Sequence, residues 1–332
     1  MKNLSIYILT IISILLINCN SNSKKETNLE NIKIKKNSSN NKIEDNRLIK
    51  VKLGVNSNQI SNEWKRVLVS RKRASKLDSL SNVVKQITKE EQGWITLIES
   101  KSNKWNTIRD SLKVPFQNIQ LKDTISILLG YQGGDDAFTY KNKTICLDVN
   151  ALNKAYGSAK NSVNHNRIDR IFAHEFTHLL HKKWAKKNNL ELNTFKDQIL
   201  WECVTEGFGM YRSMSDKWFP IGDSLSLTSK NTFKNLYPKF AKRIIKVSTH
   251  SNLTTEEENN LYTNLSRGSM KKKWGALPVA VWLALEAKGN DENLVKWVNK
   301  GPDAIILLAE KYLTNESKVI FDEFLKNYKN FE

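Results

Sequence analysis

The sequence predicts an α+β fold that is mostly helical, with a small β-sheet packed on one long helix and a helical C-terminal part. Three patterns support this fold class: apolar residues recur at helical spacing in 61–115, strand-like runs lie in 120–150, and helical patterns dominate 216–332. The chain has 332 residues, of which 39% are hydrophobic, and can therefore bury the core of one large domain.

Residues 61–115 are the helical N-terminal part of the predicted domain. Trp64, Val67 and Leu68 fall at helical spacing, and Thr88 with Glu91 three residues later is a capping-box signature that starts a second helix. The apolar face of that helix contains Trp94, Leu97, Ile98, Trp105, Ile108 and Leu112. Because proline cannot continue a helix, we expect one helix to run from Thr88 to just before Pro115.

The pattern changes to strand after residue 120. Residues 125–129 are a short apolar run typical of a buried strand, and a Gly-Gly-Asp-Asp turn follows. In 144–149 the side chains alternate, so a second strand should turn Ile145, Leu147 and Val149 to one face. We expect these segments to form a small sheet.

The rest of the chain is predicted to be mostly helical. The helices that we expect after residue 150 span 168–184, 196–214, 278–288, 293–312 and 318–328.

The N-terminus has the features of an export signal. Lys2 precedes a largely apolar run over residues 4–17, which is short for a membrane span, and Cys19 follows almost at once. This segment resembles a bacterial lipobox, which implies that residues 1–19 are a lipoprotein signal peptide and that Cys19 carries the lipid. A cleaved signal without lipid and an uncleaved anchor are the alternatives. Residues 20–60, rich in Asn, Ser and Lys, are expected to be a flexible tether.

The net charge of +19 bears on the partners of the chain. Such a charge is compatible with nucleic acid, but export argues against a nucleic-acid partner. An anionic membrane surface or an envelope polymer suits an exported basic protein, as does a lysine-rich solvated surface without a partner. We expect the chain to lie in the cell envelope, anchored by lipid to a bacterial membrane, either facing the periplasm or at the surface.

Two further cysteines, Cys146 and Cys203, lie in the predicted domain. In an oxidising compartment they can form one disulfide, or they can be two buried free thiols. They are too few for a zinc site made of four cysteines.

The motif His174-Glu175-Phe-Thr-His178 carries the chemistry. On a helix, His174 and His178 point the same way one turn apart, so both imidazoles can bind one metal ion. Glu175 lies beside the first ligand, where its carboxylate can take a proton from a water molecule that the metal activates. Apolar residues flank the motif on both sides, as in a helix that is partly buried.

A third protein ligand is expected from the segment Glu202-Cys-Val-Thr-Glu206-Gly207-Phe-Gly. This Glu-Gly-Phe-Gly segment, together with the His-Glu-x-x-His motif, resembles the gluzincin zinc metallopeptidases, in which the Glu before the Gly binds zinc. The resemblance implies Zn²⁺ held by His174, His178 and Glu206, with Gly207 allowing the glutamate helix to pack closely on the histidine helix. Glu202 is the alternative ligand, as in the thermolysin-like pattern; otherwise it orients an imidazole.

The resemblance also implies a fold and an activity. Residues 61–332 would be a zincin-like metallopeptidase domain, with a helical N-terminal part at 61–115, the sheet and metal site at 120–215 and a helical C-terminal part at 216–332. The activity would be zinc-dependent hydrolysis of peptide or protein substrates in the cell envelope, with Glu175 as general base. A non-catalytic envelope-binding lipoprotein and a zinc amidase acting on cell-wall peptides are the alternatives. Substrate peptides often add to the edge of a sheet in such enzymes, and the strand at 144–149 is our candidate edge.

Two questions stay open at this stage. His181 lies seven residues after His174, about 10 Å along a helix axis, so it is expected to be a structural or surface residue rather than a ligand. A hydrolytic site also needs a donor for the developing oxyanion. The candidate donors are Tyr211, His250, Tyr262 and Arg267.

Overall fold

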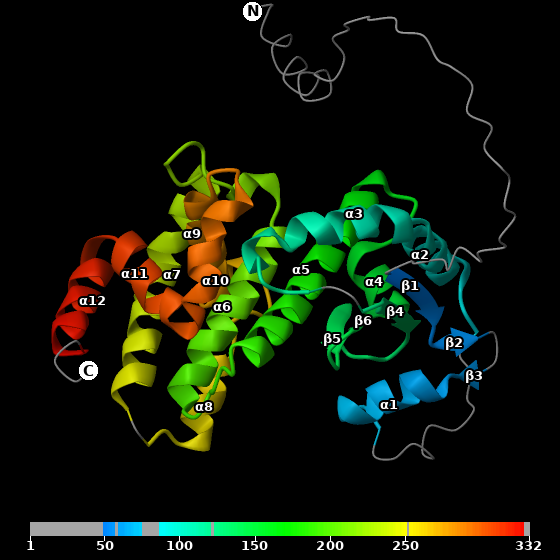
Figure 1. Ribbon diagram of the computed structural model, residues 1–332, viewed down its shortest axis with the longest axis horizontal. Helices are drawn as coiled ribbons and strands as arrows, with labels where there is room; N and C mark the ends of the chain where they lie inside the picture. The colour runs from blue at the N-terminus through cyan, green and yellow to red at the C-terminus, as the bar shows by residue number, and fades with distance from the viewer. Residues whose placement is uncertain (1–48, 57–58, 75–85, 121–122, 251, 329–332) are drawn as a thin grey trace, which may run out of the picture. The chain divides into compact units, whose positions relative to one another are not determined.

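The computed structural model describes residues 49–56, 59–74, 86–120, 123–250 and 252–328. The expected signal peptide, its Cys19 and the tether up to residue 48 lie outside the described residues. The described part is mostly helical and contains a small mixed sheet, as predicted (Figure 1). Within it, no helix is both long enough and apolar enough to cross a lipid bilayer.

The main sheet has four strands in the order β1 (Ile49–Leu53), β4 (Ile125–Gly130), β6 (Thr144–Asp148) and β5 (Ala137–Tyr140). Strands β1, β4 and β6 are parallel, whereas β5 is antiparallel to β6. The predicted tether reached to residue 60, and this boundary is wrong, because β1 pairs along β4 from Ile49 onward. A short hairpin of β2 (Val55–Asn56) and β3 (Gln59–Ile60) follows.

The prediction of 144–149 as an alternating edge strand is also wrong. β6 lies between β4 and β5, and all five of its residues are buried. Its sixth predicted member, Val149, begins the next helix. The edge strand next to β6 is β5, whose four residues were not recognised as a strand in the sequence.

The N-terminal helices agree with the prediction in part. Helix α1 (Asn62–Ser70) buries Trp64, Val67 and Leu68, and Thr88 with Glu91 forms the expected capping box on α2 (Lys89–Ser100). The single helix expected up to Pro115 is instead two, because α3 (Ser102–Leu112) starts after a break at Lys101.

The break at Lys101 lets one apolar face meet two different surfaces. On α2, the Trp94 indole donates to the carbonyl of Gly157, after helix α4 (Val149–Tyr156). On α3, the Trp105 indole donates to Asp169 at 2.8 Å and stacks on Phe172, with ring centroids 4.5 Å apart.

The remaining chain is helical, and its regular elements follow each other with short connections. They are α5 (Ser162–Lys187), α6 (Phe195–Ser213), η2 (Asp216–Trp218), α7 (Leu227–Thr249), α8 (Thr255–Tyr262), η3 (Met270–Lys272), α9 (Ala276–Ala287), η4 (Asp291–Leu294), α10 (Val295–Asn299), η5 (Gly301–Asp303), α11 (Ala304–Tyr312) and α12 (Asn315–Tyr328). The single helix predicted over 293–312 is broken, because Gly301 has φ +54° and Pro302 follows it. Helix α7 was not among the predicted helices.

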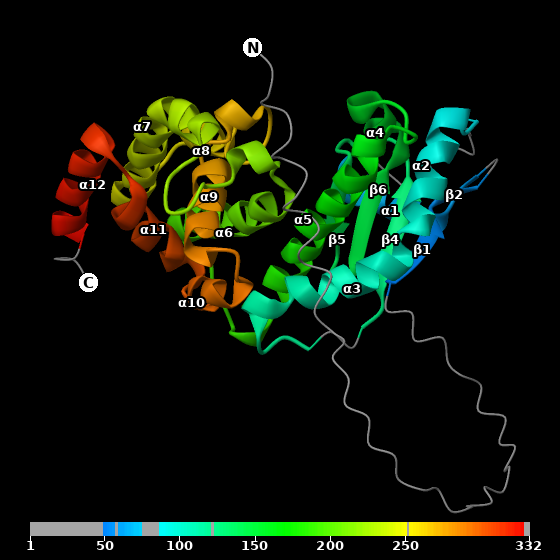
Figure 2. The ribbon, with the colours of Figure 1, turned by 90° about the horizontal axis from the view of Figure 1, so that it is seen from above.

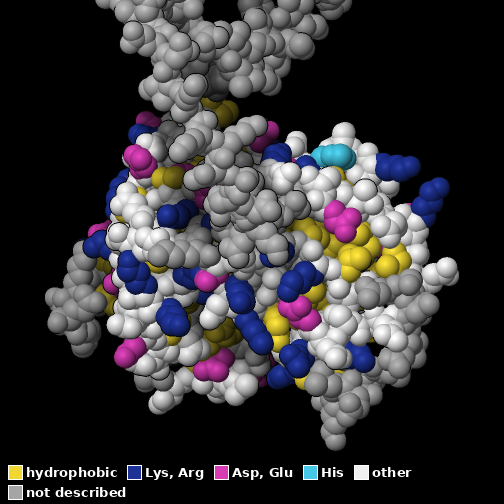
Figure 3. Space-filling view, turned by 45° about the vertical axis from the view of Figure 1, so that its right-hand side comes forward, with side chains coloured by type: hydrophobic (Ala, Val, Ile, Leu, Met, Phe, Trp, Pro, Cys, Tyr) yellow, Lys and Arg dark blue, Asp and Glu magenta, His cyan; other side chains and the backbone are white. Residues whose placement is uncertain are grey.

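The helix that carries the His-Glu-x-x-His motif, α5, lies between the sheet and the C-terminal helices (Figures 1 and 2). It packs on β5 at one side and on α6 at the other, and α6 packs in turn on α9. All twelve residues of α9 are buried, so α6 lies between α5 and a fully buried helix. On the face drawn in Figure 3, Lys and Arg side chains are scattered among Asp and Glu rather than gathered in one patch.

Candidate metal centre

Helix α5 brings His174, Glu175 and His178 together. The two imidazole rings have centroids 4.7 Å apart and planes inclined by 74°. One ligand atom from each of the three residues lies within 4.8 Å of the others, so the group can hold a metal ion.

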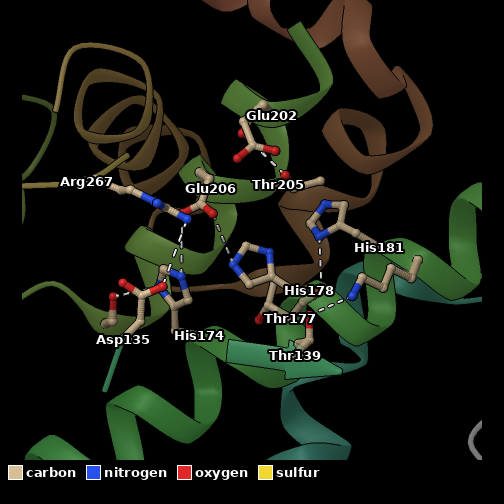
Figure 4. Close-up of polar contacts among 12 residues, drawn as sticks. Asp135, Thr139, His174, Thr177, His178, His181, Glu202, Thr205, Glu206 and Arg267 are labelled. Carbon is tan, nitrogen blue, oxygen red and sulfur yellow. Dashed lines mark hydrogen bonds and ion pairs between the residues drawn. The ribbon is translucent and has the colours of Figure 1, made fainter. Parts of the chain in front are cut away.

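Helix α6 adds Glu206 to this group (Figure 4). Its Oε2 lies 3.6 Å from Nε2 of His174, and its Oε1 lies 3.5 Å from Nε2 of His178. Two atoms that each lie about 2.1 Å from one ion at tetrahedral angles are about 3.4 Å apart. Each of these two nitrogen–oxygen distances is therefore close to the one that a shared zinc ion would give.

The protonation states of His178 and Glu206 also suit a metal. For His174, burial alone would lower the pKa, but the hydrogen bond to Glu206 and the charges of Glu175 and Glu206 outweigh burial and raise the pKa. Burial lowers the pKa of His178 to about 4, so its imidazole is neutral at pH 7. Burial alone would raise the pKa of Glu206, but His178 and His174 outweigh it and bring the pKa to about 2. A neutral imidazole and an ionised carboxylate are the forms that bind metals.

Glu175 has a different environment although it is the next residue after His174. Its side chain is buried, and this burial raises its pKa to about 7. A carboxylate with a pKa close to neutral can both accept and return a proton at physiological pH.

Ser213, the last residue of α6, fixes the orientation of His174. The Ser213 hydroxyl donates to the carbonyl of Met210 at 3.4 Å, and its Oγ lies 3.2 Å from Nδ1 of His174. Because the hydroxyl has one proton, Nδ1–H of His174 is the donor to Oγ. The other ring nitrogen, Nε2, is then the atom that faces Glu206. The sequence analysis did not identify Ser213.

The glycine that allows α6 to approach the histidine helix is Gly209, not Gly207. A Cβ on Gly209 would lie 2.9–3.0 Å from the His174 ring, whereas one on Gly207 would lie 2.3 Å from Val279 of α9. The expectation for Gly207 was wrong because residues two apart on a helix face different sides.

Glu202 lies one turn before Glu206 on the same helix and lines the same cleft (Figure 4). It makes no ion pair with either imidazole, since both pair with Glu206. Burial raises its pKa to about 7, and the charge of Glu206 adds to this effect. The structure thus brings Glu206, rather than Glu202, to the two Nε2 atoms.

The sequence profile of a family described as "Putative zinc dependent peptidase (DUF5700)" matches residues 13–308. The chain belongs to this family. No curated protein and no solved structure matches the chain significantly. The matched range contains α5 and α6, and with them the whole candidate metal centre.

His181 does not take part in the metal centre of this family member. It is buried between the rings of Phe116, Trp201 and Phe208. Its Nδ1 lies 3.0 Å from the carbonyl of Thr177, and burial lowers its pKa to about 3. His181 is a neutral core residue, as expected.

Of the four candidate oxyanion donors, only Arg267 lines the cleft at the metal centre. The Tyr211 hydroxyl donates to Asp291 at 3.0 Å, His250 ends α7, and Tyr262 packs on Phe195. Lys273, which the sequence analysis did not single out, also lines the cleft and is half-buried.

The cleft has a volume of about 900 Å³ and contains the metal centre in its wall. Helix α5, strand β5, helix α6 and the segment 266–273 line it. Strand β5 contributes Ala137, Phe138 and Thr139, so the free edge of the sheet borders the cleft.

The two cysteines of the domain are free and buried, on β6 and α6 respectively. Of the two alternatives, the pair of buried thiols is therefore the one that the structure contains.

Proposed function

We propose that this chain is a zinc peptidase in which His174, His178 and Glu206 hold the metal. One observation carries the proposal: both Nε2 atoms face the two oxygens of a single carboxylate, at 3.5 and 3.6 Å. The family description supports a zinc-dependent peptidase in general terms. Its finer features, the ligand set and the catalytic base, rest on the geometry of these residues.

A zinc ion in a site of this kind acidifies a water molecule and polarises the carbonyl of the substrate. Glu175 is the general base in the proposal: a carboxylate oxygen accepts the proton of the attacking water. Its pKa of about 7 suits this step, because the same group can then return the proton to the departing amine nitrogen. Ser213 keeps the Nδ1 proton on His174, and this proton assignment leaves Nε2 free to bind.

The substrate is proposed to be an extended peptide that pairs with the edge strand β5. The cleft follows β5 and α5 side by side, and β5 has a free edge in the described part of the sheet. Backbone hydrogen bonds to such an edge can position a peptide bond independently of its side chains.

The proposed location is the cell envelope, with a lipid on Cys19 as the membrane anchor and no nucleic-acid partner. The motivation is the apolar run that ends just before Cys19. Replacing Cys19→Ser in the full chain should abolish lipidation and move the protein out of the membrane fraction. An unchanged mass and unchanged partitioning would point to an ordinary signal peptide or an uncleaved anchor.

The activity is tested on the domain from residue 46 onward, loaded with zinc and incubated with a peptide library that includes cell-wall peptides. We expect about one zinc per chain, and cleavage that falls about 10²–10⁴-fold in Glu175→Gln. The variant should keep its zinc, since the amide preserves the shape of the side chain. Cleavage by the variant within a few-fold of the wild type would exclude Glu175 as the base, and a lack of zinc in the wild type would exclude the site.

A further inference from the structure

The face of α5 that borders the cleft carries a charged residue on each side of the histidines. Arg170, His174, His178 and Lys182 follow each other at intervals of four residues, and all four line the cleft. At 1.5 Å rise per residue, each cation lies about 6 Å along the axis from the nearer histidine. An extended peptide that runs along α5 past the metal centre would meet one cation on each side.

Neither cation has a carboxylate partner in the described part of the chain. The Lys182 ammonium donates to Oγ1 of Thr139 on β5 at 2.6 Å. It interacts electrostatically with Glu175 but forms no ion pair with it. Among the residues that the structure describes, the Arg170 guanidinium makes no hydrogen bond or ion pair, and its Nε is buried without a partner.

Other arginines of the cleft are committed to neighbours. Arg71 and Arg267 both pair with Asp135, and Arg71 also lies over the ring of Phe138. Arg167 donates to Asn164 and lies over the ring of Tyr156. Arg170 and Lys182 therefore differ from these arginines in keeping their charge available to a ligand.

The acids of the cleft cannot supply the missing partners. Glu206 lies between the two histidines, Asp135 pairs with Arg71, and Asp136 accepts a hydrogen bond from Tyr156. Glu175 has no ion pair with Lys182. Glu202 lies on α6, one turn before Glu206 in the chain. Arg170 is half-buried and Lys182 is exposed, and an uncompensated positive charge in a cleft attracts an anionic ligand.

We propose that the cleft selects acidic peptides, and that Arg170 and Lys182 bind substrate carboxylates on opposite sides of the scissile bond. This proposal rests on the proposed peptidase function and adds a substrate class to it. An extended chain advances about 3.3 Å per residue, so the carboxylates belong within about three residues of the scissile bond.

The test uses a matched set of peptides with one central sequence and with Glu, Gln or Lys at the flanking positions. We expect the Glu peptides to have a kcat/KM about tenfold above the Gln peptides on each side, through a lower KM, and the Lys peptides to be poorest. Raising NaCl from about 50 mM to about 500 mM should reduce this preference, because exposed charges are screened.

Three variants connect the preference to the residues. Arg170→Gln and Lys182→Gln should each remove the preference for Glu on one side only, and Lys182→Glu should reverse it toward Lys. Lys186→Gln is the matched control, because Lys186 is an exposed lysine of the same helix that does not line the cleft. A preference that survives in both Gln variants would overturn the assignment, as would a wild-type enzyme that cleaves neutral or basic peptides equally well.

Binding separates this proposal from the peptidase function. The affinity of Glu175→Gln for rhodamine-labelled peptides of the same set, measured by fluorescence anisotropy, does not need hydrolysis. Tighter binding of the acidic peptides without any cleavage by the wild type would contradict the peptidase function and leave the acidic ligand class supported. Cleavage without a charge preference in rate or in binding would contradict the acidic class alone.

Discussion

The hydroxyl of Ser213 lies 3.2 Å from Nδ1 of His174, so the last residue of α6 sets the orientation of a ring on α5. The same hydroxyl donates its one proton to the carbonyl of Met210. The proton of the hydrogen bond between Ser213 and His174 therefore belongs to Nδ1 of the imidazole. A partner that fixes the tautomer of a histidine ligand commonly changes metal affinity by about 10–100-fold.

Replacing Ser213→Ala should therefore weaken zinc binding by about tenfold or more without unfolding the protein. A competition titration against a chromophoric chelator measures the affinity, and circular dichroism checks the fold. Ser213→Thr should restore most of the affinity, because it returns a hydroxyl to the same position.

The control for this prediction is Ser100→Ala. Ser100 is the last residue of α2, and its hydroxyl donates to the carbonyl three residues earlier, at Leu97, as that of Ser213 does at Met210. It has no histidine beside it, so zinc affinity should not change. An equal loss in both alanine variants would mean that the effect comes from the helix end and not from the imidazole.

Gly209 and Gly207 offer a second matched pair. A methyl group on Gly209 would lie within about 3 Å of the His174 ring and should displace it, so Gly209→Ala should lower zinc affinity steeply. Gly207→Ala would press on Val279 instead, and overpacking of this kind costs about 1–3 kcal/mol of stability. Zinc titration should therefore show the weaker binding in Gly209→Ala. Urea unfolding of the metal-free variants should show the lower stability in Gly207→Ala. Equal zinc affinities in the two folded variants would contradict the contact with His174.

The sequence predicted the features of the site that depend on local spacing. His174 and His178 are one helical turn apart whatever the rest of the fold, so their pairing followed from the motif alone. The capping box at Thr88 and Glu91 is equally local, and the structure contains it.

Features that depend on distant partners could not be read in the same way. Ser213 and Gly209 matter only because α6 crosses α5 at that point, and nothing in their own segment marks that contact. The edge strand β5 has four residues and little periodicity, and β1 gains its strand structure by pairing with β4, which lies far along the chain. In each case tertiary packing, and not local propensity, determines the contact or the secondary structure.

Glu286 on α9 makes stability depend on pH through contacts far from the metal centre. It is buried, pairs with Lys311 and with Lys296 at 2.9 Å, and accepts hydrogen bonds from Tyr312 and Trp297. Burial alone would raise its pKa, but these partners outweigh burial and lower the pKa to about 2. A group whose pKa is depressed on folding stabilises the fold above its unfolded pKa and loses this contribution as pH falls through the folded value.

We therefore expect Glu286→Gln to lower the free energy of unfolding by about 2 kcal/mol at pH 7, after allowance for solvent around the half-exposed lysines. The gap between wild type and variant should stay constant down to about pH 5 and close between about pH 4.5 and pH 2. Urea unfolding of the metal-free protein across this range measures it, with Glu292→Gln, an exposed carboxylate nearby in the chain, as control. A gap that widens as pH falls would contradict the assigned direction.

The last prediction separates the two glutamates of α6. Glu206 lies 3.5–3.6 Å from both Nε2 atoms, whereas Glu202 is one turn away and pairs with neither imidazole. Glu206→Gln should reduce zinc affinity by more than about a hundredfold, beyond the effect of losing an orienting partner, while Glu202→Gln should change it by less than about tenfold. Gln nearly conserves the volume of Glu, so both variants should keep α6 packed between α5 and α9, and circular dichroism with urea unfolding checks this. Zinc titration of the two folded variants gives the ranking. If Glu202→Gln were the weaker binder, the thermolysin-like alternative would hold, and α6 would have to rotate on zinc binding to bring Glu202 to the histidines.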